Sequence, residues 1–360
     1  MTNGQIESTI LAKDFSAVHR CSSRAERDYR DVIDDLIASF ERARDDRPPA
    51  GRSATELGIL THLRELFIAA GVERVRGLLR PQAWIQLDLA FASEDQHQRF
   101  SASPRLRAAI ERWRAAELVS QFWFMHKPPG MRLRLLVPDA DARAEAEILA
   151  FMHEAERDGL IHEYGFGMYD EELHQFGGET GLDLFHRFST YDSLCILEFR
   201  ELEAAGAATI DATVLSLLAL CDLFARVAGD PWEQWDMWCE LRITGRLFDA
   251  DTPTPPELRE GLDHNRELLE AIVFERETIV AALEPDEARI VADYERGNQE
   301  LADALAKAVR ARALSYAPRK LLPFFVVFHW NRMGLDIDDQ ISLSAFMFEL
   351  LNPKYLRRLP

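Results

Sequence analysis

The chain has 360 residues, of which 47% are hydrophobic and 29% charged, and its formal net charge is −19. This length and apolar content suffice for one or two folded domains and exclude a largely disordered chain. The negative charge argues against a nucleic-acid-binding protein, because phosphate contacts require clustered Lys and Arg.

The first 83 residues are predicted to form a helical N-terminal lead. Residues 24–44 place Val32, Leu36 and Phe40 on one helical face. A polar segment, DDRPPAGR, follows, and Ser53 with Glu56 then forms a capping-box pattern that begins a second helix. This part of the chain carries no functional signal of its own.

Residues 84–180 are predicted to form an α+β sheet unit. WIQLDLAFA alternates apolar and polar residues as a half-buried strand does, and a helix is expected over 104–118. QFWFMHK and MRLRLLV read as two strands joined at Pro128, Pro129 and Gly130. A helix capped by Asp139 and the extended segment LIHEYGFGMY complete the order. The pattern βαββαβ predicts a ferredoxin-like four-stranded sheet with helices on one face.

Residues 181–360 are predicted to be a helical C-terminal half, packed with the sheet unit as one fold. Long amphipathic runs are expected over 257–283 and 285–314, after the Pro-rich break DADTPTPPEL. No apolar stretch reaches the roughly 20 residues that span a bilayer. The sequence MTNGQIEST lacks a signal-peptide pattern, so a cytoplasmic protein without membrane contact is expected.

Common enzyme motifs are absent from the sequence. It contains no Walker A loop, complete GxGxxG, HExxH, GxSxG or EF-hand loop. The four cysteines show no metal-ligand spacing, so neither a zinc site nor a disulfide framework is expected. The functional signal must therefore come from other residues.

Three segments, in order, have the character of motifs. The strand QFWFMHK leads through a turn into MRLRL at 131–135. The stretch YDEELHQFGG at 169–178 is followed by Asp192 and Ser193, and HWNRMG occupies 329–334.

Together these segments resemble the thiopeptide-type bacteriocin biosynthesis domain, which is also the C-terminal elimination domain of class I lanthipeptide dehydratases. The resemblance covers residues 84–351. The family patterns are HLRLR, YxPExxRYGG with an Asp-Ser pair, and a His-containing NR-G segment. This chain departs from them with Met131 in place of His, Glu171 in place of Pro and Gln175 in place of Arg.

The resemblance implies a role for each matched residue. It implies catalytic roles for Tyr169, Glu172 and His329. It implies substrate binding by Arg132, Arg134, Gln175, Asp192, Ser193, Asn331 and Arg332.

Each assignment has a structural alternative. Arg132 and Arg134 alternate with Leu, so both guanidiniums share a face and can hold a carboxylate or a peptide carbonyl, or they form the polar face of an edge strand. Tyr169 and Glu172 are in a strand-end loop that suits binding, or they are a structural hydrogen-bonded pair. His329 lies in an apolar run, where a buried histidine is commonly structural.

The resemblance implies one of two reactions on a ribosomally made, leader-bearing precursor peptide. The first choice is a pyridine synthase that joins two dehydroalanines in a formal [4+2] aza-cycloaddition and expels water and the leader peptide to form a macrocycle. The first alternative is elimination of glutamate from glutamylated Ser or Thr, as a subunit of a split dehydratase. The second alternative is a non-catalytic leader-binding scaffold.

The replacements at Met131 and Gln175 favour cyclisation, because they remove groups that glutamate elimination can use. Neither reaction demands a metal or redox cofactor, so none is expected. The expected partners are the precursor peptide and upstream dehydratase subunits.

Overall fold

The computed structural model describes residues 82–128, 130–138, 142–244 and 254–353. Contacts assign the chain from Ala83 onward to one compact unit. The predicted N-terminal helices and the predicted Asp139 cap lie outside the described residues. The sequence-based boundary between a sheet unit and a helical half stays a prediction.

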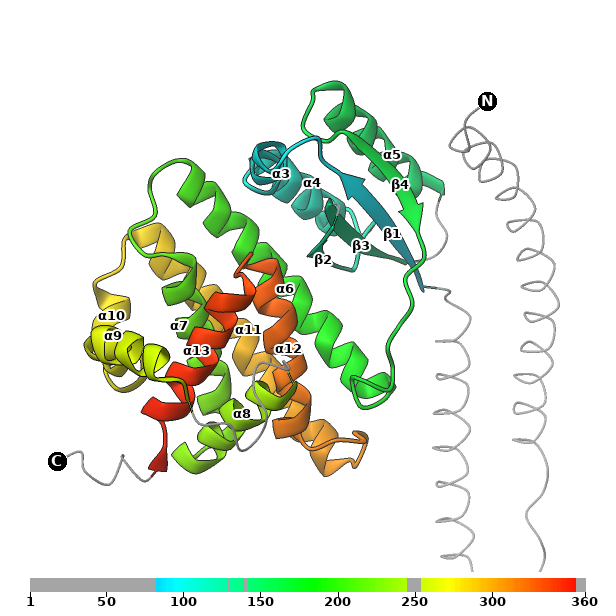
Figure 1. Cartoon of the computed structure of the whole chain (residues 1–360). Helices are drawn as coiled ribbons and strands as arrows, with labels where there is room; N and C mark the ends of the chain where they lie inside the picture. The colour runs from blue at the N-terminus through cyan, green and yellow to red at the C-terminus, as the bar shows by residue number, and fades with distance from the viewer. Residues whose placement is uncertain (1–81, 129, 139–141, 245–253, 354–360) are drawn as a thin grey trace, which may run out of the picture. The chain divides into compact units, whose positions relative to one another are not determined.

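The sheet has four strands, as the sequence predicts (Figure 1). They are β1 (Gln82–Ala90), β2 (Gln121–Lys127), β3 (Gly130–Pro138) and β4 (Glu163–Gly167). Their spatial order is β2-β3-β1-β4, and the pairs β1–β4 and β2–β3 are antiparallel. The α+β class is therefore confirmed, whereas the finer ferredoxin-like arrangement stays a prediction.

Two helices, not the single predicted one, connect β1 to β2. They are α3 (Glu94–Ser101) and α4 (Pro104–Ala115), and α5 (Ala142–Arg157) connects β3 to β4. The Ser93 hydroxyl accepts a hydrogen bond from the backbone N–H of Gln96 and so caps α3. Helix α3, with the sequence EDQHQRFS, was not predicted, because Phe100 is its only large apolar residue and no apolar period is visible.

The described part of the helical half contains eight helices. They are α6 (Glu179–Ala204), α7 (Ala212–Ala228), α8 (Pro231–Thr244), α9 (Pro256–Phe274), α10 (Arg276–Ala281), α11 (Pro285–Arg310), α12 (Pro318–Arg332) and α13 (Ile337–Leu350). The run predicted over 257–283 is in fact two helices, because Glu275 leaves helical geometry with φ −125° and ψ 30°. The run predicted over 285–314 ends early, at Arg310, and Arg312 adopts a left-handed φ of 55°.

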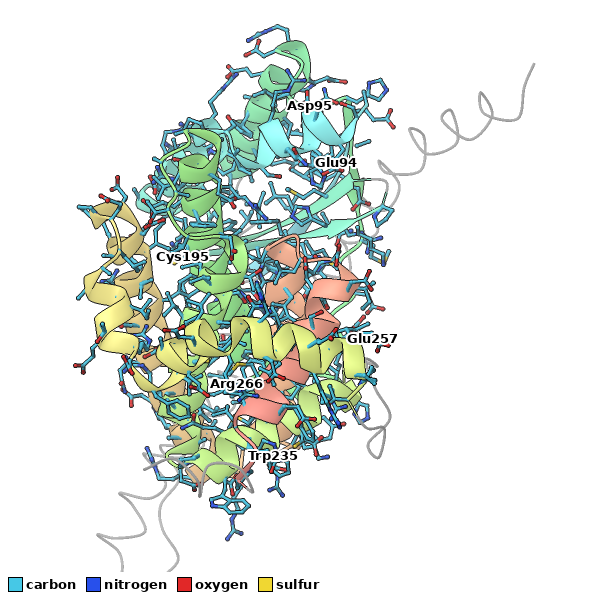
Figure 2. All side chains as sticks on the ribbon, turned by 60° about the vertical axis from the view of Figure 1, so that its left-hand side comes forward. Glu94, Asp95, Cys195, Trp235, Glu257 and Arg266 are labelled. Atoms are coloured by element: carbon cyan, nitrogen blue, oxygen red, sulfur yellow. The ribbon has the colours of Figure 1, made fainter. Side chains whose placement is uncertain are left out.

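Helix α6 joins the sheet to the helices. It packs against β2 and α4 as well as α11 and α12, and α12 also packs on β2 (Figure 1). Figure 2 shows Glu94 and Asp95 of α3 at the sheet end of the unit, and Glu257 and Arg266 of α9 in the helical part. The sheet therefore packs through β2 against α6 and α12, and the predicted site residues lie where these elements meet.

Candidate active site

Strand pairing places the two predicted arginines beside aromatic and sulfur side chains. Arg134 is paired with Trp123 across β2 and β3, and Arg132 is paired with Met125. Because successive residues of a strand point to opposite faces, these four side chains share one face of the sheet. The alternation with Leu that is visible in the sequence therefore does place both guanidiniums on one face.

The Arg134 guanidinium lies between two aromatic rings. Its Cζ is 4.1 Å from the Trp123 ring centroid and 4.4 Å from that of Tyr169, and its Nε donates to Gln86 Oε1 at 2.8 Å. Only 7% of Arg134 is exposed. Burial lowers the pKa of Arg134 to about 10, so the group remains a cation at neutral pH. The cage of two rings fixes its direction, and this suits it to orient a bound carbonyl or carboxylate.

Tyr169 is bonded to a histidine that sequence patterns did not single out. Its hydroxyl lies 2.7 Å from Nε2 of His186, a residue of α6. Burial, together with the charge of Arg134, lowers the pKa of His186 to about 3, and burial raises the pKa of Tyr169 above its usual value. Both groups are therefore neutral near pH 7. When Nε2 of His186 carries the proton, such a neutral pair can act as a relay, in which Tyr169 gives its proton to a substrate while it takes the Nε2 proton.

Carboxylates lie around the two arginines. Asp88 Oδ1 is 3.5 Å from Arg132 Nε and accepts from Gln86 Nε2 at 2.9 Å. The negative charges of Asp88 and Glu172 act on Arg134 and oppose the effect of burial on its pKa. Burial also raises the pKa of Glu171, which is close enough to influence Tyr169. The cations of this surface are thus largely offset by nearby acids.

A second cluster, centred on Asp192, is completely enclosed. Asp192 Oδ1 is 2.6 Å from His329 Nδ1 and accepts from the Tyr294 hydroxyl at 2.9 Å. Its other oxygen accepts from Arg332 Nε at 2.7 Å. His329 Nε2 lies 2.9 Å from the Ser216 hydroxyl. We call these five residues the Asp192 cluster.

The Asp192 cluster is an ionic core. Asp192, His329 and Arg332 are each 0% exposed. Desolvation alone would raise the pKa of Asp192, but His329 and Arg332 outweigh it and lower that pKa to about 2. A carboxylate buried this deeply requires such partners, because an isolated buried charge is strongly unfavourable.

Asn331 connects α12 to β2 by two hydrogen bonds. Its side-chain oxygen accepts from the His126 backbone N–H at 2.8 Å, and its side-chain nitrogen donates to the His126 carbonyl at 2.9 Å. The His126 ring lies 3.2 Å from the Arg332 carbonyl through Nε2 and 2.8 Å from His97 Nε2 through Nδ1. Because a carbonyl only accepts, Nε2 of His126 carries the proton and Nδ1 accepts from His97.

We expect the His126→Gln variant to lose less stability on acidification than the unaltered protein. Burial, with the charges of His97, Arg200 and Arg332, lowers the pKa of His126 from 6.5 to about 3 in the folded state. Between pH 6.5 and about pH 3 the unfolded chain therefore binds more protons at His126 than the folded protein does. The contribution of neutral, buried His126 to the free energy of unfolding is thus fully present above pH 6.5 and is lost as the pH falls toward 3. For one such residue the loss between pH 7 and pH 5 is roughly 2 kcal/mol.

Urea unfolding at the two pH values measures this difference. His153→Gln is the matched control, because His153 is an exposed histidine bonded to the Leu149 carbonyl. Equal pH dependence in the unaltered protein and the His126→Gln variant would contradict the expectation.

The structure divides the predicted site residues into two sets. One set lies on the face of the sheet that bears Arg132 and Arg134, which we call the sheet face, with Tyr169 and Glu172 beside it. Gln175 is half-buried in the loop before α6. Asp192, His329 and Arg332 lie in the enclosed cluster, and Ser193 beside Asp192 is also 0% exposed. The Trp123 ring adjoins both sets, since Arg332 Cζ is 6.0 Å from its centroid. His329 has no exposed surface through which to meet a peptide in this conformation.

Sequence reasoning missed several residues of the sheet face. The alternation in WIQLDLAFA already puts Trp84, Gln86 and Asp88 on one face, so a signal for them existed. His186 gave no such signal, because its helix is apolar on most sides and the contact with Tyr169 is tertiary. His97 belongs to the helix that was not predicted.

A large pocket of about 1380 Å³ opens beside the His97–His126 pair. Its walls include Lys127, Arg200 and Asn331, but not Arg134 or Tyr169. Arg200 is held by Glu203 and by the Met333 carbonyl, and Asn331 by the His126 backbone. We therefore regard the sheet face with the Tyr169–His186 pair as the better candidate for chemistry.

Over the described ranges, no group of three or more His, Cys, Asp or Glu side chains is arranged to hold a metal ion. None of the helices described here is long and apolar enough to cross a membrane.

Comparison with known proteins identifies the family. The family described as lantibiotic biosynthesis dehydratase C-term matches residues 84–351, and the chain belongs to this family. No curated protein matches the chain.

Two solved structures are similar to this chain. One is the tRNA-dependent lantibiotic dehydratase MibB from Microbispora sp. 107891, with 17% identity and a TM-score of 0.58, covering 77% of this chain and 28% of MibB. The other is TsrL, with 13% identity and a TM-score of 0.47, covering 76% of this chain and 95% of TsrL. This chain thus corresponds to little more than a quarter of the dehydratase.

Proposed function

We propose that this protein is a peptide-modifying enzyme that forms a pyridine ring from two dehydroalanines of a leader-bearing precursor peptide. The observation that carries the proposal is the neutral Tyr169–His186 pair beside the caged Arg134. Membership of the dehydratase C-terminal family supports a role in the biosynthesis of ribosomally made, modified peptides. We further propose that the sheet unit is a ferredoxin-like variant and that the protein acts in the cytoplasm with upstream dehydratase subunits.

The charge of the sheet face favours cyclisation over glutamate elimination. Elimination expels a carboxylate, so its site must supply positive charge where negative charge develops. Here Arg132 is paired with Asp88, and Arg134 lies in the field of Asp88 and Glu172. Gln175, at a position where the family pattern has Arg, adds no cation. A substrate that stays neutral, such as a dehydroalanine-containing amide, fits this balance better.

The residues suggest how the steps are divided. Arg134 donates hydrogen bonds to a peptide carbonyl and orients the two alkenes for ring closure. The amide must first tautomerise, so its nitrogen loses a proton while its carbonyl oxygen gains one. The Tyr169 hydroxyl supplies the proton to oxygen and takes the Nε2 proton of His186, whose other ring nitrogen is reprotonated from water, while the exposed Glu172 carboxylate accepts the proton from nitrogen and releases it to water.

Two eliminations complete the reaction. The ring hydroxyl leaves as water after it receives a proton, and the leader peptide leaves as its carboxamide when its nitrogen is protonated. The Tyr169–His186 pair can provide these protons, and Glu172 can remove the ring protons that aromatisation releases. Asp192, His329, Asn331 and Arg332 then act as positioning residues, since they hold α6, α12 and β2 together behind the Trp123 ring.

Glutamate elimination remains the second candidate. The fold similarity to MibB favours it, and Arg132 and Arg134 are both present on the sheet face. A scaffold that binds the leader without turnover is the third candidate, because a caged arginine can also hold a peptide that is never modified.

Mass spectrometry with two synthetic peptides separates these candidates. One leader-bearing peptide contains two spaced dehydroalanines, and the other contains a glutamylated serine. We expect the first peptide to yield a pyridine macrocycle and a free leader carboxamide, and the second to remain unchanged. Loss of glutamate from the second peptide would establish elimination instead, and binding of both peptides without any mass change would favour the scaffold.

A further inference from the structure

Strand β4 is an edge of the sheet. In the part of the chain that the structure describes it pairs with β1 alone, antiparallel, over Glu163 to Gly167. An edge strand presents a row of unpaired backbone N–H and C=O groups, which readily accept a further strand. Natural edges are usually protected by charges, prolines or bulges, and EYGFG has only the charge of Glu163.

The side chains at this edge are unusually apolar for an exposed strand. Phe166 is 46% exposed, and Met168, just after the strand, is 89% exposed. Tyr164 shares the alternation with both and lies against His153 of α5. Phe166 and Met168 therefore extend the apolar side of the sheet beyond the cover of α5. Exposed apolar side chains at a strand edge commonly mark an interaction surface.

The other face of β4 is bare backbone next to the candidate site. A Cβ at Gly165 would meet no atom within 4 Å. A Cβ at Gly167 would collide with the side chains of Gln86 and Asp88. The side chains of Gln86 and Asp88, which bind Arg134 and Arg132, thus lie over the β4 backbone. Glycine at position 167 leaves room for them.

We propose that the open edge of β4 binds an extended segment of the precursor peptide as an added fifth strand. This inference rests on the proposed function. Main-chain hydrogen bonds to β4 would hold the segment, and its alternate side chains would cover Phe166 and Met168 on one face and approach Asp88 on the other. Tyr169 is the second residue after the end of β4, so the added strand delivers the peptide directly to the candidate site.

Charge defines the chemistry of the bound segment. Exposed acidic residues lie at both ends of the edge, Glu163 at one end and Asp170 and Glu171 at the other, and Asp88 lies between them. A segment without acidic residues, with neutral or basic side chains facing Asp88, complements this edge. An acidic segment would meet like charge at both ends of the edge.

Hydrogen exchange of the full chain tests the added strand. The probe is a synthetic leader-bearing peptide labelled with fluorescein, in which two serines stand in place of the two dehydroalanines. Alternate backbone amides of β4 already bond to β1, so the test reads the outward-facing amides of residues 163–168. We expect these outward-facing amides to exchange quickly in the protein alone and at least about tenfold more slowly once fluorescence anisotropy shows the peptide bound. Protection of these amides without the peptide would overturn the proposal, because residues 1–81 or a second copy of the chain would then already occupy the edge.

Two serine substitutions test the apolar contacts. Phe166→Ser with Met168→Ser should weaken peptide binding by about tenfold or more, since burial of one large apolar side chain is worth roughly that factor. Leu268→Ser is the matched control, because Leu268 is 44% exposed and lies on α9, which Figure 2 shows in the helical part of the unit. We expect the control variant to bind as the unaltered protein does, and both variants to keep its urea midpoint.

The outcomes separate the docking surface from the reaction. Slowed exchange at 163–168 without turnover of the dehydroalanine peptide would refute the reaction and retain the docking surface. Turnover with an unchanged KM in the double variant would refute the docking surface and retain the reaction.

Discussion

The Asp192→Ala variant is expected to lose about 3–5 kcal/mol of unfolding free energy, because it leaves a buried arginine without its counter-ion. Asp192 accepts hydrogen bonds from Tyr294 and Arg332 and lies against His329, all within a core that water does not reach. Asp192→Asn keeps the shape of the side chain but removes its charge, so it should cost less than Asp192→Ala. Urea unfolding followed by circular dichroism measures both differences.

Asp183→Ala is the matched control for this prediction. Asp183 lies on the same helix and pairs with Arg187 at 2.8 Å, but both side chains are largely exposed. An exposed pair of this kind contributes about 0.5 kcal/mol or less. Similar losses in the Asp183→Ala and Asp192→Ala variants would contradict an ionic core at Asp192.

The Tyr169→Phe variant is expected to reduce kcat for pyridine formation by about 100-fold or more, because it removes a positioned proton donor. The aromatic ring that covers Arg134 is retained, so the substrate should still bind. Quenched-flow mass spectrometry of the macrocycle, together with the KM of the dehydroalanine peptide, separates these two effects. A loss confined to KM would assign Tyr169 to binding alone.

Tyr164→Phe is the control for this substitution. Tyr164 also contacts a histidine, His153, at 3.2 Å, but this pair lies on the exposed side of β4 and α5. Its removal should leave kcat unchanged. His186→Gln should lower kcat in the same direction as Tyr169→Phe, because it removes the imidazole that returns the proton to Tyr169.

The strands were readable from the sequence because their pattern is local. QFWFMHK was predicted with the same bounds that β2 has, and β3 begins at Gly130, the last residue of the Pro-Pro-Gly signal. Helix α3 was missed because its residues are mostly polar, so it lacks the apolar period that reveals a helix. The break at Glu275 was missed because neither Gly nor Pro marks it.

The candidate site was only partly readable because its essential contacts are tertiary. The shared face of Arg132 and Arg134 follows from strand alternation alone. The hydrogen bond between Tyr169 and His186 requires the loop after β4 to fold back on α6, which no local pattern encodes. The enclosure of His329 depends on Asp192 and Ser216, which lie on other helices far away in the sequence.

The two hydrogen bonds between the Asn331 side chain and the His126 backbone join residues that are 205 positions apart. At a synthesis rate of about 5–20 residues per second, β2 leaves the ribosome roughly 10–40 s before Asn331 does. During this interval the newly made β2 lacks the α12 residue that later holds its backbone, so it is open to pairing with other chains. A nascent chain paused before α12 should therefore bind chaperones that capture exposed strands, and release from them should coincide with the emergence of Asn331.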